Sequence, residues 1–228
     1  MSKDLEPLSI QKMPGYREAA YNAIKESILS GYFKYGEALV EEEIAAKLQV
    51  SRTPVREALA ILQHEQLIAP RRGRGFHVRQ MIREEFIELF VANEVVEPYL
   101  ARLAALHATP EQIQDMKDTV ISGRQCAMDK NVPGLLRAGR DFHRAMGNAA
   151  GNKVLTRFVI ANEERTDLYL LNNGSIIDSK NLSQSNQEHE AIIHAIAQRD
   201  PEAAARLVIH HSQSVRDRLT IFFAERPL

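Results

Sequence analysis

The sequence predicts three short helices closed by a β-hairpin, followed by a bundle made only of helices. Two observations lead to this expectation. Apolar residues recur with helical spacing along most of the chain. The one strong strand signal is LIAPRRGRGFHV at 67–78, where two short apolar runs flank a tip rich in Gly and Arg. No further strand signal follows Arg79, so the rest of the chain is expected to be all-α.

Length and composition fit two packed domains. The chain has 228 residues, 44% of them hydrophobic, which is enough for a core in each domain. We expect a mobile arm over 1–15, a first domain over 16–79 and a second domain over 80–228. No long apolar run or signal core occurs, so a cytoplasmic protein without a membrane partner is expected. The single cysteine, Cys126, excludes an internal disulfide and a cysteine metal cluster.

The first domain is expected to hold helices over 16–30, 41–48 and 51–65. The second of these, EEEIAAKL, begins with acids, as the helix dipole favours. The third begins SRTPVREAL, where Ser51 or Thr53 can cap the helix and Pro54 fits the first turn. Together with the hairpin, these helices predict a winged helix-turn-helix.

The start of the third helix is unusual in its charge. Arg52 and Arg56 lie one turn apart at a helix end where the dipole favours negative charge. Residues 51–80 hold six arginines against two glutamates, a balance of +4 in a chain whose net charge is −1. Such a local basic patch favours phosphate binding, and the second helix of a helix-turn-helix enters the major groove. The sequence therefore predicts DNA contacts from Ser51, Arg52, Thr53 and Arg56, and from the hairpin residues Arg71, Arg72, Gly73, Arg74 and Gly75.

The second domain is expected to contain six or seven helices. The apolar spacing places them near 83–107, 110–129, 132–149, 151–173, 183–199 and 201–225. Two starts are well marked. Thr109 begins a capping box with proline at the first helical position, and Asp200 is also followed by proline.

Helix phase turns three histidines inward, each from a different helix: His143, His189 and His211. Each one alone is compatible with a hydrogen-bonded core residue. Three that converge can also bind a metal, because neutral imidazoles are common ligands of zinc and its neighbours in the divalent series. The phase leaves both interpretations open.

Two parts of the chain carry a family resemblance. The segment LVEEEIAAKLQVSRTPVREALAILQHEQLIAPRRGRGFHV resembles the DNA-binding domain of the GntR family of bacterial transcription regulators. The segments DFHRAMGNAAGN, EHEAIIHAI and DPEAAARLVIHH resemble the ligand-binding FCD domain of its FadR-type branch. The resemblance implies a homodimer that binds a palindromic operator. A repressor is one form that such a regulator takes. The resemblance also implies that a small organic acid, sensed in the helical domain, changes the affinity for DNA.

The resemblance extends to site residues. Metal-binding members of the family carry histidines at the positions of His143, His189 and His211. They also carry an aspartate one turn before the first histidine, where this chain has Gly139. The resemblance therefore implies a weakened site for zinc, nickel, manganese or iron. Many members have an arginine near the position of Asn93, so Asn93 and the three histidines are the expected effector contacts.

Two other functions compete with this interpretation. A metal-dependent hydrolase could use three histidines with an open position. No carboxylate stands at a diagnostic spacing, however, and Glu188 and Glu190 are expected to point away from the site. A DNA-binding protein without an effector is the other alternative, although a helical domain of this size exceeds what dimerisation needs. We therefore expect a regulator and not an enzyme.

Overall fold

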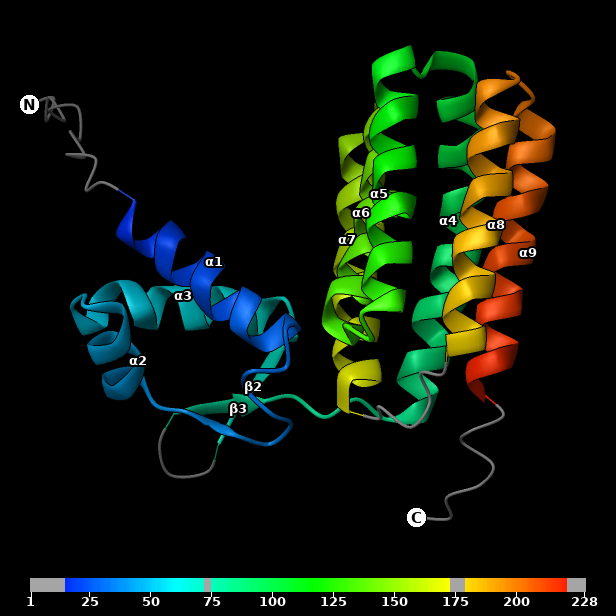
Figure 1. The fold of residues 1–228 in the computed structure, drawn as a ribbon. Coiled ribbons are helices and arrows are strands. Elements are labelled where there is room, and N and C mark those ends of the chain that lie inside the picture. The colour runs from blue at the N-terminus through cyan, green and yellow to red at the C-terminus, as the bar shows by residue number, and fades with distance from the viewer. Residues whose placement is uncertain (1–14, 72–74, 173–178, 221–228) are drawn as a thin grey trace, which may run out of the picture.

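The computed structural model describes residues 15–71, 75–172 and 179–220, with side chains left out at 172–183 and 220. The expected arm, except Gly15, and Arg72, Gly73 and Arg74 of the hairpin tip lie outside the described residues. In the described part, two compact regions stand side by side, joined by the segment that follows the hairpin (Figure 1).

The N-terminal region contains three helices and a small antiparallel sheet. Its helices are α1 (Tyr16–Leu29), α2 (Glu41–Leu48) and α3 (Arg52–His64); its strands are β1 (Ala38–Leu39), β2 (Ile68–Pro70) and β3 (Phe76–Val78). The hairpin β2–β3 is confirmed, with Ala69 opposite His77. The sequence did not reveal β1, which pairs with the other edge of β3 to give the order β1-β3-β2, because two residues are too few to show a period.

The helical bundle contains six helices in the described residues. They are α4 (Arg83–His107), α5 (Pro110–Met128), α6 (Val132–Ala149), α7 (Lys153–Asn172), α8 (Ser179–Ala197) and α9 (Pro201–Thr220). Both marked starts are confirmed: Thr109 and Gln112 form a complete capping box, and Asp200 accepts a hydrogen bond from the Ala203 amide. Helix α8 begins at Ser179, four residues earlier than expected. No helix in the described ranges combines the length and the apolar character needed to span a membrane.

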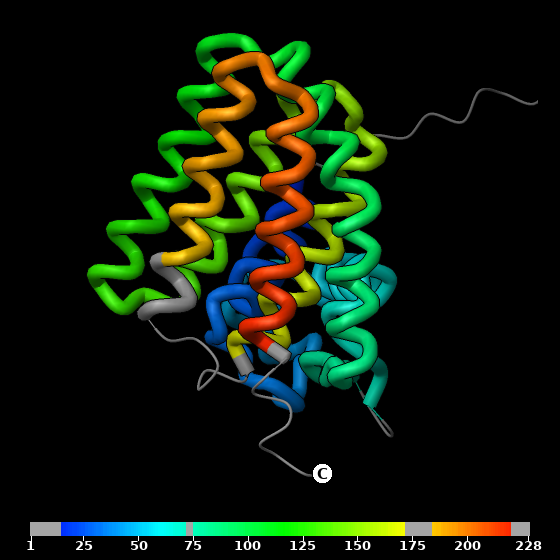
Figure 2. The backbone as a smooth tube through the Cα atoms, turned by 90° about the vertical axis from the view of Figure 1, so that its right-hand side faces the viewer, coloured from blue at the N-terminus to red at the C-terminus, as the bar shows by residue number. Residues whose placement is uncertain are grey.

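The bundle helices run along one another (Figure 2), and buried apolar side chains pack between them to form a core. This core is filled by large buried side chains from different helices: Leu100, Met116, Phe142, Met146, Ile192, Ile196 and Val208. A separate cluster fills the N-terminal region: Ile24, Ile28, Leu39, Val55, Leu59, Leu62, Leu67, Ile68 and Val78. One residue of the bundle, Leu168 of α7, is buried in this N-terminal cluster.

Polar contacts also join the two regions. Lys25 of α1 pairs with Glu164 of α7 at 2.7 Å and with Glu65, just after α3, at 3.1 Å. Burial opposes the charge on Lys25, but the two carboxylates and Tyr21 raise its pKa. Glu26 of α1 pairs with Arg137 of α6 in the same interface. The N-terminal region is thus attached to α7 and α6 by both apolar and charged contacts.

Truncation of Leu168 tests this attachment. We expect Leu168→Ala to destabilise the N-terminal region by about 2–5 kcal/mol, because it leaves a cavity in that region's core. Hydrogen exchange read by mass spectrometry should show protection lost in α1 and α3. The control is Ile121→Ala, at a position of α5 that is 59% exposed. Unchanged protection in α1 and α3 would show that Leu168 does not support the N-terminal core.

Candidate DNA-binding and metal sites

Helix α3 presents its basic residues to solvent. Val55, Leu59 and Leu62 form the buried face, whereas Arg52 and Arg56, beside this face in the first turns, have side chains 57% and 64% exposed. Ser51 occupies the N-cap position, but its hydroxyl makes no capping hydrogen bond. Ser51 and Thr53 are both exposed at the helix start. The four residues expected to contact DNA here, Ser51 at the N-cap and Arg52, Thr53 and Arg56 of α3, are therefore all accessible at the start of this helix.

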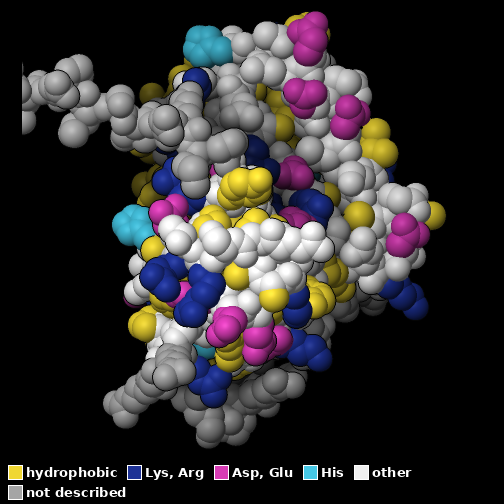
Figure 3. Space-filling model, turned by 90° about the vertical axis from the view of Figure 1, so that its left-hand side faces the viewer, with side chains coloured by type: hydrophobic (Ala, Val, Ile, Leu, Met, Phe, Trp, Pro, Cys, Tyr) yellow, Lys and Arg dark blue, Asp and Glu magenta, His cyan; other side chains and the backbone are white. Residues whose placement is uncertain are grey.

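This surface is not uniformly basic. Seen from the side of the N-terminal region, Lys and Arg side chains alternate with acidic ones (Figure 3). Glu41, the first residue of α2, accepts hydrogen bonds from Nε and Nη2 of Arg56, both at 3.1 Å to Oε2. The same oxygen lies 3.7 Å from Nη2 of Arg52. One carboxylate thus contacts both arginines of the expected recognition helix.

The described part of the wing comprises its two strands and the residues that border the tip. Arg71 is exposed, and its amide donates to the carbonyl of Gly75 at 3.0 Å. Gly75 has a φ of 77°, and a Cβ there would lie 3.0 Å from the carbonyl oxygen of Leu39. Glycine at this position is therefore required by the fold itself, because β1 passes close to the hairpin.

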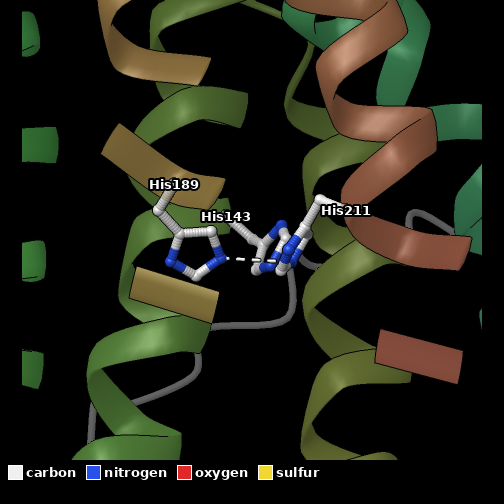
Figure 4. A group of neighbouring side chains, drawn as sticks. All are labelled: His143, His189 and His211. Atoms are coloured by element: carbon white, nitrogen blue, oxygen red, sulfur yellow. Dashed lines mark hydrogen bonds between the residues drawn. The ribbon is translucent and has the colours of Figure 1, made fainter. Parts of the chain in front are cut away.

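The structure brings the three inward histidines together. His143 of α6, His189 of α8 and His211 of α9 are all buried, and each offers a ring nitrogen within 4.8 Å of the other two. The Nε2 atoms of His189 and His211 are 3.1 Å apart. Figure 4 shows the three rings directed toward one another from separate helices. Helix phase alone had predicted this inward orientation.

Carboxylates stand beside two of these rings. Glu188 Oε2 lies 2.7 Å from Nδ1 of His211, so the expectation that Glu188 points away was wrong. Its position is set by α9, where Arg218 and Ser214 also donate to it. Glu97 Oε1 lies 2.5 Å from Nδ1 of His143, although neither atom has a well-aligned hydrogen bond. Glu190 points outward as expected and pairs with Arg124.

The surroundings shift the pKa of each ring. Burial lowers the pKa of His189 far below its usual value, and the neighbouring His211 and His143 add to this effect. Burial also lowers the pKa of His211, although Glu188 opposes the shift. Burial disfavours the charged form of His143 as well, but Glu97 and Glu163 outweigh it and raise its pKa to about 9. At neutral pH His189 and His211 are therefore neutral, as metal ligands must be, whereas His143 is protonated and would have to release its proton to bind a metal.

A cavity of about 120 Å³ adjoins the histidines. An apolar cavity of about 150 Å³ holds benzene, so this one suits a small molecule. Its wall combines leucine, valine and phenylalanine side chains with charged and amide groups: Asn93, Glu97, Arg140, Glu163, Asp167 and Arg218. Gly139 also lines it, and a Cβ there would meet no atom within 4 Å. The place of the missing aspartate is thus open space.

Sequence reasoning missed most of these polar wall residues. Arg140 and Asp167 form a buried ion pair, and burial still raises the pKa of Asp167 to about 8. Asn93 donates to Glu163 at 2.8 Å, and burial raises the pKa of Glu163 too. A usable signal did exist. Glu97 follows Asn93 by one turn on the buried face of α4, and Arg140 lies one turn before His143.

Comparison with protein families assigns both regions. Residues 16–78 match the family described as "Bacterial regulatory proteins, gntR family", and residues 88–214 match the FCD domain. The "Uxu operon transcriptional regulator" of Escherichia coli is 29% identical over 87% of this chain and 84% of its own. The "Nta operon transcriptional regulator" of Aminobacter aminovorans is 27% identical over 84% of this chain and 88% of its own.

Solved structures show the same fold. The Escherichia coli protein McbR/YncC superposes with a TM-score of 0.78 at 18% identity, over 93% of this chain and 99% of its own. A GntR regulator from Rhodococcus sp. RHA1 gives 0.77 at 22% identity, over 92% and 99%. The relatives are transcription regulators and not enzymes, which removes the hydrolase alternative. The chain therefore belongs to the GntR family of bacterial transcription regulators, as a DNA-binding regulator with an FCD domain.

Proposed function

We propose that this regulator is a cytoplasmic homodimer of the FadR type, with domains over 16–79 and 80–228, whose operator affinity responds to a small organic acid. One observation carries the proposal. Three buried imidazoles and several charged side chains surround a cavity whose wall includes α7, and α7 is also packed into the N-terminal region. A ligand in the cavity therefore contacts the helix that supports the DNA-binding domain.

DNA recognition is assigned to the exposed start of α3. Arg52 and Arg56 are suited to guanine edges or phosphates, and Ser51 and Thr53 to phosphates at the helix start. Arg71 and the wing tip, with Arg72, Gly73, Arg74 and Gly75, are assigned to backbone or minor-groove contacts. Two copies on a palindrome would present two such surfaces to half-sites about one helical turn or slightly more apart.

Removal of either arginine tests this assignment. Arg52→Ala and Arg56→Ala should each weaken binding to a duplex selected from a random library by the wild type. A lost base contact is worth about 1–3 kcal/mol. Fluorescence anisotropy gives the affinity. Arg124→Ala removes the same charge from α5, far along the chain from α3, and should leave binding unchanged. Wild-type affinity in both α3 variants would refute the assignment of α3 as the recognition helix.

The histidine cluster fits a divalent metal. Imidazole nitrogens about 2.0–2.1 Å from one zinc ion lie about 2.9–3.4 Å apart. Nε2 of His189 and His211 match this at 3.1 Å, and the full set of three ring nitrogens, with His143, spans up to 4.8 Å, so small side-chain shifts would complete the site. Glu188 beside His211 and Glu97 beside His143 suit the outer carboxylates that orient such ligands. The donor set accepts zinc, nickel, manganese or iron. When bound, the metal would supply a positive centre to which an effector carboxylate can coordinate.

Elemental analysis tests the metal. Tag-free protein purified without chelator is expected to contain one of these metals. The content should fall sharply in His189→Ala/His211→Ala, and chelator should lower the melting temperature of the wild type but not of this variant. The control is His194→Ala/His210→Ala, which removes two exposed histidines from the same helices. A wild type that stays empty after incubation with each metal would contradict the site.

The cavity itself supports an acidic effector. Arg140 is buried, and its Nε has no hydrogen-bond partner among the described residues, which leaves a donor for a carboxylate at the cavity wall. Asn93, also in the wall, donates to Glu163 and accepts from Asn162, so an effector could use only the second N–H of its amide. The relatives are named for different operons, so the effector is proposed from the cavity and not from them. A "Probable D-xylose utilization operon transcriptional repressor", 30% identical to this chain, supports repression as the mode of action.

Helix α7 offers a direct route from the cavity to DNA. Glu163, Asp167 and Leu170 line the cavity, while Glu164 pairs with Lys25 and Leu168 fills the N-terminal core. These residues alternate within two turns of one helix. A shift of α7 on ligand binding would therefore change the orientation of the DNA-binding domain.

An exposed apolar surface supports the dimer. On α4, Val91, Val95 and Tyr99 are 45%, 75% and 49% exposed at spacings of four residues, and Leu106 continues the line at 56%. Figure 2 shows α4 at an outer edge of the bundle. Val154 and Phe158 on the neighbouring helix α7 are 70% and 44% exposed. Such a stripe on one helix is self-complementary across a two-fold axis.

A charge placed in this stripe should separate the dimer. Val95→Glu is expected to give a monomer in sedimentation equilibrium and to lose operator affinity more than tenfold, since both half-sites are no longer held together. The monomer fold should survive because the side chain is exposed. Ile121→Glu, which places the same charge at an exposed position of α5, should remain dimeric. An undisturbed dimer in Val95→Glu would rule out this surface.

A further inference from the structure

Helix α2 begins with three consecutive glutamates, and the first, Glu41, pairs with arginines of the expected recognition helix. The dipole of α2 explains acids at its start in general. Glu42 and Glu43 are exposed, and no ion pair is recorded for them among the described residues. The side chain of Glu41 is only 19% exposed, because it lies against the start of α3. A general preference for acids does not account for this placement.

The contacts of Glu41 are specific to one edge of Arg56. Its carboxylate accepts from Nε at 3.1 and 3.3 Å and from Nη2 at 3.1 Å. The guanidinium has five N–H donors, and this pairing uses the edge formed by Nε and Nη2. Nη1 is then directed away from the carboxylate. The end of the guanidinium remains available for the O6 and N7 atoms of a guanine, which an arginine binds with two parallel hydrogen bonds.

Stability does not explain the arrangement. An ion pair with side chains as exposed as those of Arg52 and Arg56 adds little to folding. On a surface that faces DNA, a carboxylate also repels phosphates and so weakens binding to any sequence. An arginine that is held in place, however, loses less side-chain freedom when it reads a base. The same carboxylate competes with phosphates for the guanidinium, which disfavours incorrect contacts.

We propose that Glu41 is a specificity-determining residue, which orients Arg56 and, at longer range, Arg52 for base reading and limits their binding to phosphates. This inference rests on the proposed role of the α3 arginines in DNA recognition. Glu41 makes no base contact in this scheme and acts through the two guanidinium groups.

The test compares two variants with the same charge change. Glu41→Gln and Glu42→Gln each remove one negative charge from the first turn of α2. Affinities are measured over a range of salt concentrations, for the duplex selected by the wild type and for a scrambled duplex of equal length. Both variants should bind the scrambled duplex more tightly. Only Glu41→Gln should also lower the ratio of specific to non-specific affinity beyond this charge effect, by about tenfold relative to Glu42→Gln.

A double substitution separates positioning from charge. In Arg56→Ala, the added Glu41→Gln change should lower the ratio much less than it does in the wild type, because its main partner is gone. Equal ratios in Glu41→Gln and Glu42→Gln would overturn the inference. If Arg56→Ala lowers the ratio but Glu41→Gln does not, the proposed role of Glu41 is wrong, whereas the assignment of the recognition helix stands. If Arg52→Ala and Arg56→Ala both leave the ratio unchanged, the recognition helix itself is wrong.

Discussion

Helix α7 has to satisfy several packing environments at once, and the arrangement of the chain depends on this constraint. Near its start Val159 is part of the bundle core, further along Leu168 enters the N-terminal core, and Leu170 packs in a third cluster with Phe86. Polar residues between these positions face either the cavity or α1. These positions lie within about three turns of one helix, so we expect a displacement at one of these surfaces to reach the others.

The bundle also buries charge, which is costly unless each group is paired. Arg140 with Asp167 and Glu188 with His211 and Arg218 meet this requirement, but the raised pKa values of Asp167 and Glu163 show that the compensation is incomplete. Well-packed apolar residues of similar size would give the bundle equal or greater stability without this desolvation cost. Groups kept at such a cost beside a cavity are typical of a binding site.

The DNA-binding surface follows a different principle. There the charges are exposed, contribute little to stability and are mixed in sign. Glu41 pairs with Arg56 and lies near Arg52, and in the proposed scheme it lowers the attraction for phosphates in exchange for defined guanidinium positions. In protein–DNA recognition generally, phosphate contacts position the protein, whereas contacts to base edges determine which sequence is preferred.

Local features were readable from the sequence because their causes are local. Helical periodicity gave the helices within a few residues, and Thr109 and Asp200 marked two starts through their own capping bonds. The helical phase of the sequence was enough to predict that His143, His189 and His211 face inward. The two-residue strand β1 was not predicted, because it is defined only by its pairing with β3.

Only the tertiary structure decided which groups face the histidines. Glu188 was misplaced because the period of α8 says which face is buried, but not that Arg218 and Ser214 of α9 lie opposite to hold its carboxylate. For the same reason Glu97, Arg140 and Asp167 were not recognised as wall residues of one cavity. The sequence by itself determined the two kinds of region and the inward histidines, through residues near one another in the chain. The charged cavity and the double role of α7 arise from contacts between helices distant in sequence, which no local pattern records.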